Sequence, residues 1–114
     1  MNPTLLVGLG GVAGALARHL LGERIEEDTA DTLAVNVLGS FLLGVLVAVP
    51  AGSDLLLAAG TGFCGAFTTF STFAYETVRL AESGRPRRAV LNGTVNLVGA
   101  LVAVGLGVSV GGLL

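Results

Sequence analysis

The sequence has no lysine and no tryptophan, and only 12% of its 114 residues are charged. Soluble domains carry about 25% charged residues, so this content excludes an ordinary soluble protein. The formal net charge of −2 excludes the basic surface that nucleic-acid binding requires, and we expect no nucleic-acid partner. The single cysteine, Cys64, excludes an intrachain disulfide.

Apolar residues and glycine are abundant instead. Hydrophobic residues make up 53% of the chain, and there are 18 glycines. Small residues recur at four-residue spacing, as in Gly10 with Gly14 and Gly107 with Gly111, a pattern that lets membrane helices approach closely. We expect an all-α integral membrane protein with a single domain over residues 1–114. Residues 1–21 lack a basic start, so we expect a first spanning helix there and no cleavable signal.

Four segments reach the length of about 20 apolar residues that a spanning helix needs. The predicted helices cover residues 4–21, 32–49, 54–82 and 87–110. Asp31 or Thr32 is the expected N-cap of the second helix, and Ser53 or Asp54 that of the third. Four helices make a thin bundle that cannot enclose a wide pore alone, so we expect an oligomer.

Residues 62–73 form the most informative motif, inside the third hydrophobic segment. It combines two glycines, four small hydroxyl residues and four phenylalanines in twelve positions. This mixture predicts a helix that breaks near Gly65 to Thr69. Irregular backbone inside a membrane is tolerated only where it is buried in protein or where it lines a cavity. The motif therefore indicates an ion or solute pathway.

Two pairs of polar residues share a helix face at four-residue spacing. One pair is Asn36 with Ser40, and the other is Asn92 with Asn96. An amide in hydrocarbon is costly unless it is partnered. Its N–H groups suit an anion and its carbonyl suits a neighbouring donor. Both a polar track for an ion and a clamp between helices explain these residues.

Phe70 and Phe73 also share a face, and paired phenylalanines in a membrane helix usually serve packing. Here hydroxyl residues surround them, and aromatic rings carry a positive edge. Ring edges can line an anion path without trapping the ion. The accompanying hydroxyl residues are Thr68, Thr69, Ser71 and Thr72.

The predicted break leaves carbonyl oxygens without helical donors. Such oxygens suit hard cations, so two copies meeting at the break would be able to hold one small cation. We also expect Arg18 to pair with Glu76, and His19 to lie at the membrane interface. No set of residues typical of an enzyme is present, and we expect no catalytic activity.

The arginines predict the orientation. The first and third loops hold Arg24, Arg79, Arg85, Arg87 and Arg88, with Arg18 nearby, whereas the side with both termini has none. Basic loops stay in the cytoplasm. We therefore expect the first and third loops in the cytoplasm and both termini outside.

The chain resembles the CrcB/Fluc family of fluoride channels over nearly its whole length. The resemblance rests on four stretches, residues 10–18, 32–41, 62–73 and 92–99, of which the third is the most specific. It implies an antiparallel dual-pore dimer that exports fluoride passively. It further implies a structural sodium ion held by the backbone carbonyls of Gly65 and Thr68. The implied fluoride pathway comprises Asn36, Ser40, Thr69, Phe70, Ser71, Thr72, Phe73 and Asn96.

One feature departs from the simplest member of that family. Homodimeric members insert in both orientations and need a weak charge bias, whereas this chain has a strong one. We therefore hypothesise an oppositely oriented paralogue as its partner. Two other functions compete: a small multidrug transporter, which needs a carboxylate within the first helix where this chain has none before Glu23, and a non-conducting assembly subunit.

Overall fold

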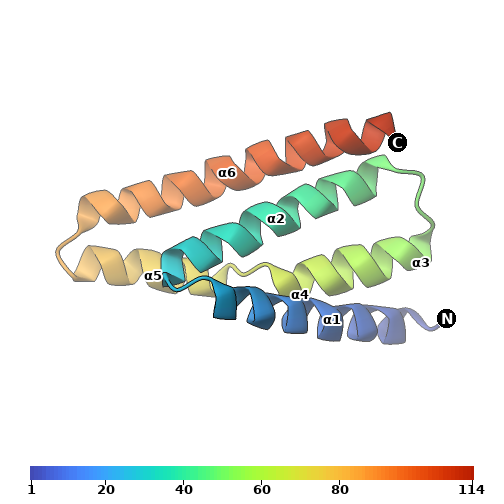
Figure 1. Cartoon of the computed structure of the whole chain (residues 1–114), viewed down its shortest axis with the longest axis horizontal. Helices are drawn as coiled ribbons and strands as arrows, with labels where there is room; N and C mark the ends of the chain where they lie inside the picture. The colour runs from blue at the N-terminus through green and yellow to red at the C-terminus, as the bar shows by residue number, and fades with distance from the viewer.

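In the computed structural model, which describes all 114 residues, the chain is helical and contains no strand. Four helical segments are long and apolar enough to cross a membrane, which confirms the all-α membrane class. They lie along one long axis (Figure 1), and the molecule measures 49 × 28 × 22 Å. The long axis matches a bilayer of about 40–45 Å with its headgroup regions. The elements are α1 (Pro3–Arg24), α2 (Asp28–Ala48), α3 (Ser53–Leu55), η1 (Leu56–Cys64), α4 (Gly65–Phe67), α5 (Ser71–Glu82) and α6 (Pro86–Leu113).

The connection between the first two helices is shorter than the sequence predicted. α1 continues to Arg24 and α2 already begins at Asp28, with Glu27 as its N-cap. The expected capping role of Asp31 or Thr32 is therefore wrong. Asp28 and Asp31 instead lie in the first turn of α2, where negative charge is favoured by the helix dipole.

Two other boundaries also shift by one residue. Gly52, not Ser53 or Asp54, is the N-cap of α3. Pro86 opens α6 because its fixed φ suits the first helical position and its missing N–H is not needed there.

The third hydrophobic segment is made of several elements. After the short α3, η1 has the wider π-helical winding over nine residues. α4 then ends at Phe67, and Thr68 is extended, with φ −86° and ψ 165°. The next helix, α5, begins only at Ser71. Residues 68–70 thus lie between two helices at the place that the site occupies.

Glycines bring the helices together in two pairs, α1 with η1 and α2 with α6. A Cβ atom on Gly10 or Gly14 would overlap the carbonyl groups of Ala58 or Phe63 in the third segment. On α6, a Cβ atom on Gly107 would overlap the Phe41 carbonyl oxygen and lie 3.0 Å from the Val45 nitrogen. The predicted small-residue spacing is therefore confirmed as packing within the chain.

We expect Gly107→Val to destabilise the protein by about 1–3 kcal/mol, because the new side chain must push α2 away from α6. Gly105→Val is the matched control, since a Cβ atom there meets nothing within 4 Å. The free energy of unfolding in mixed micelles of mild detergent and dodecyl sulfate measures both. Equal losses in the two variants would contradict close packing at Gly107.

Candidate functional site

A cleft of about 530 Å³ lies beside residues 68–70, between α2, the third segment and α6. Six of the eight predicted pathway residues line it, together with Gly65 and Thr68. Of the other two, Thr72 lines a neighbouring cavity, and Ser71 lies 3.5 Å from Thr69 between their hydroxyl oxygens. The six in the cleft are Asn36, Ser40, Thr69, Phe70, Phe73 and Asn96.

The amide of Asn36 binds the backbone of Thr69 at two points. Its Nδ2 donates to the Thr69 carbonyl oxygen at 3.0 Å, and its Oδ1 accepts from the Thr69 N–H at 2.8 Å. Its Nδ2 also donates to Asn96 Oδ1 at 3.4 Å. Because Thr69 makes no helical backbone hydrogen bond, this side chain supplies the partners that its N–H and carbonyl groups would otherwise lack. Of the two explanations left open by the sequence, the geometry shows the clamp.

The amides on α6 continue this network toward α5. Asn96 is buried, and its Nδ2 donates to the Asn92 carbonyl oxygen at 2.9 Å and to Asn92 Oδ1 at 3.3 Å. Asn92 Nδ2 in turn donates to Thr77 Oγ1 at 2.9 Å. With its amide nitrogen engaged on Asn92, Asn96 turns its Oδ1 toward Asn36. The two asparagines of α6 therefore fix the orientation of each other and of the clamp.

The rings of Phe70 and Phe73 stand together at the cleft, with centroids 5.8 Å apart and planes tilted by 57°. Phe70 is 77% exposed although it lies in a membrane segment. Phe63 and Phe67 form a separate stacked pair, with centroids 5.5 Å apart. Only the first pair lines the cleft, so the four rings of the motif divide into two groups.

A second, polar cavity of about 550 Å³ adjoins the first, and Thr69 lines both. Arg18 Nη2 donates to Thr72 Oγ1 at 3.0 Å, and Thr69 Oγ1 donates to the same hydroxyl at 3.1 Å. A guanidinium and two hydroxyls thus connect the polar cavity with the cleft. Sequence reasoning missed this cavity, although the hydroxyls of the motif and Arg18 were its signal.

The expected ion pair between Arg18 and Glu76 is wrong. Arg18 bonds Thr72, one helical turn before Glu76 on α5, so its guanidinium is already engaged at the break. The one ion pair in the structure joins His19 and Glu23 at 3.1 Å, both of them exposed.

The backbone at the break presents two carbonyl oxygens that lose their helical donors. In a continuous α-helix, the N–H of residue i+4 would bond the carbonyl of residue i. The Thr69 N–H, which would bond the Gly65 carbonyl, donates to Asn36 Oδ1. The Thr72 N–H, which would bond the Thr68 carbonyl, donates to Thr69 Oγ1 at 3.2 Å. Two neutral oxygens are therefore free to act as ligands of a hard cation.

The sequence matches the family described as "CrcB-like protein, Camphor Resistance (CrcB)" over residues 5–108. It is 49% identical to a Natronomonas pharaonis protein named fluoride-specific ion channel FluC 2, over 96% of this chain and 95% of the relative. A Methanocaldococcus jannaschii protein named fluoride-specific ion channel FluC is 44% identical, over 90% and 89%. An Acinetobacter baumannii protein with that name is 41% identical, over 94% and 91%.

We expect Asn36→Leu to speed hydrogen exchange at the Thr69 amide by about tenfold or more, because a part-buried N–H loses its acceptor. Ser40→Ala is the matched control, since Ser40 lines the same cleft but donates no hydrogen bond in the structure. Exchange followed by mass spectrometry over residues 68–72 measures the difference. Unchanged exchange in Asn36→Leu would contradict the clamp.

Proposed function

The chain belongs to the CrcB-like family, and we propose that it is a fluoride-selective channel that lets fluoride leave the cell passively and so relieves fluoride toxicity. The observation that carries this proposal is the cleft at residues 68–70, where uncharged hydrogen-bond donors and aromatic edges meet inside a membrane segment. The names of the relatives supply the identity of the ion.

The pathway that we propose runs through both cavities. Arg18 attracts an anion into the polar cavity, and the hydroxyls of Thr72 and Thr69 pass it toward the cleft. There the edges of Phe70 and Phe73 replace part of the hydration shell of the ion. Conduction needs sites that bind weakly enough to release the ion, and neutral groups meet that need. Asn36, Ser40, Ser71 and Asn96 are the remaining polar groups of the proposed path.

We propose that the conducting unit is an antiparallel dimer with two pores. The cleft has walls from α2, the third segment and α6 but is open on the side where Phe70 projects. A second subunit across this opening would cover Phe70 and complete each path. A four-helix chain of this size supplies only part of a pore wall by itself.

The free carbonyl oxygens of Gly65 and Thr68 suit a structural sodium ion at the centre of that dimer. Sodium prefers neutral oxygen ligands, and both oxygens have lost the donors that a continuous helix would provide. Two copies meeting at the break would supply two such pairs. When bound, the ion would place a positive charge between the two paths.

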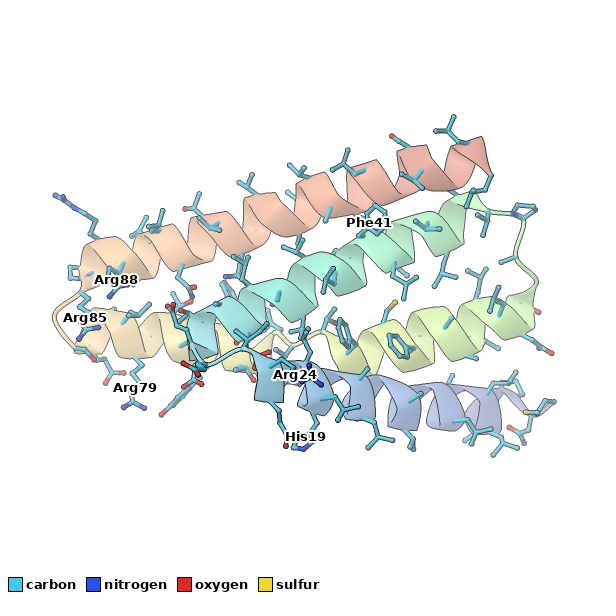
Figure 2. The ribbon with its side chains drawn as sticks, in the orientation of Figure 1. His19, Arg24, Phe41, Arg79, Arg85 and Arg88 are labelled. Carbon is cyan, nitrogen blue, oxygen red and sulfur yellow. The ribbon has the colours of Figure 1, made fainter.

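The charge bias supports a fixed orientation, with both termini outside and the first and third loops in the cytoplasm. Figure 2 shows Arg79, Arg85 and Arg88 at the end where α5 meets α6. A chain held in one orientation needs a partner held in the other. We therefore propose an oppositely oriented paralogue as the second subunit.

The two competing functions have less support. A small multidrug transporter would use a carboxylate embedded in the first helix, whereas Glu23 lies in the last turn of α1 and is exposed. A non-conducting assembly subunit would explain the glycine contacts, but it gives no reason for a polar cavity and a cleft that share Thr69.

We expect Phe70→Ile to abolish most fluoride efflux, because isoleucine has no positive ring edge. Phe63→Ile is the matched control, since Phe63 lies in the same motif but does not line the cleft. Efflux from liposomes that hold each variant together with an oppositely oriented paralogue, read with a fluoride electrode and with chloride as the control anion, measures both. Normal efflux in Phe70→Ile, or an equal loss in both variants, would contradict the proposed path.

Co-reconstitution tests the partner. We expect the chain alone to give little fluoride efflux, because its subunits all insert in one orientation. Adding a paralogue of the opposite charge bias should restore efflux without chloride loss. Rapid efflux from the chain alone, with a terminal tag exposed equally on both sides, would refute the heterodimer while leaving the channel function intact.

A further inference from the structure

A third hollow lies at the arginine-rich end of the molecule, apart from the central cleft but next to the polar cavity, with which it shares Asp28, Thr29, Leu80 and Arg85. It has a volume of about 490 Å³ and runs between the beginnings of α2 and α6 and the end of α5. Its mouth holds Arg85 and Arg88 on one side and Glu27 and Asp28 on the other. Deeper along α2 and α6 its walls become apolar. These walls include Leu33, Leu91 and Val95.

This groove is therefore charged at one end and apolar at the other. From Arg88 to Val95 it follows α6 for about 10 Å, at 1.5 Å per residue. Because Figure 1 places the α5–α6 connection at one end of the long axis, the charged mouth lies at the membrane surface and the apolar walls point into the bilayer. A phospholipid in the bilayer is arranged in the same way, with its charged headgroup at the membrane surface and its apolar chains toward the interior.

Three of the four charges at the mouth lack partners within the protein. Arg85 and Arg88 are exposed and make no side-chain hydrogen bond or ion pair, since the one ion pair in the chain joins His19 and Glu23. The Asp28 carboxylate is also unpaired, while Glu27 accepts one hydrogen bond from Thr29. Two guanidiniums and two carboxylates thus face one groove without neutralising each other.

The groove also lies apart from the opening that the proposed partner subunit would cover. Leu91 and Val95 point into the groove, whereas Leu97 and Ala100 of the same helix line the central cleft. At 3.6 residues per turn, these two sets are about 170° apart around α6. Leu91 is 60% exposed, which suits a surface that lipid covers.

We propose that this groove binds one glycerophospholipid whose headgroup carries hydrogen-bond donors. The phosphate lies between Arg85 and Arg88, because guanidinium groups match phosphate oxygens in geometry and charge. The donors of the headgroup, the hydroxyls of phosphatidylglycerol or the ammonium of phosphatidylethanolamine, reach the carboxylates of Glu27 and Asp28. One acyl chain follows Leu33, Leu91 and Val95. The site requires only that the protein sits in a membrane, and lipid retention is measured without fluoride flux, so a failure of this site and a failure of the proposed channel are distinguishable.

Native mass spectrometry of the detergent-solubilised protein tests this site, with equal amounts of phosphatidylglycerol, phosphatidylethanolamine and phosphatidylcholine of the same acyl chains. We expect the first two lipids to be retained over phosphatidylcholine, which has no headgroup donor. Arg88→Gln should reduce that retention by about fivefold, the usual contribution of one basic residue near an anionic surface. Arg88 lines this groove and neither of the other two cavities.

Arg87→Gln is the matched control, because it removes the same charge from the neighbouring residue, which does not line the groove. On the acidic side, Glu27→Gln should lower the preference over phosphatidylcholine, whereas Glu26→Gln should not. Equal retention of the three lipids would overturn the proposal. So would equal losses in Arg88→Gln and Arg87→Gln, which would indicate net charge and not a site.

Discussion

The structure depends on the two-point hydrogen bond between the Asn36 amide and the backbone of Thr69. Inside a membrane no water satisfies a free N–H or carbonyl group, so an interruption of a helix costs several kcal/mol for each group left unpaired. Asn36 removes that cost for both the N–H and the carbonyl group of Thr69. Because Asn96 and Asn92 hold Asn36 in turn, α2 and α6 together stabilise an irregular segment that the third helix could not keep alone.

The other features of the site follow from this clamp. Since the Thr69 N–H is engaged on Asn36, the Gly65 carbonyl is released; since Thr69 Oγ1 takes the Thr72 N–H, the Thr68 carbonyl is released as well. The extended backbone at Thr68 also leaves Phe70 largely exposed at the cleft that it lines together with Phe73. One interruption thus provides two free carbonyl oxygens, an exposed phenylalanine ring and a link between two cavities.

The sequence predicted the four membrane segments because hydropathy over about 20 residues is a strong signal. It also predicted that the glycine pairs are contact points, because a Cβ atom has no room in closely packed helices. It did not predict η1, since π-helical winding has no distinct hydrophobic period. The sequence left the role of Asn36 open, because an amide suits several partners. It predicted the wrong partner for Arg18, because a guanidinium can reach either Thr72 or Glu76. Such choices depend on distances between helices that are far apart in sequence.

The same packing explains why the cleft is open on one side. The glycine contacts of α1 with η1 and of α2 with α6 bring backbones so close that no pathway fits between those helices. Polar groups therefore lie away from these glycine contacts, where the helices diverge. The helices diverge beside residues 68–70, and the cleft there is open to the outside. Polar groups and irregular backbone that an open cleft exposes to a bilayer are costly unless protein covers them. The tight packing that gives so small a chain its fold therefore also favours assembly with a second subunit.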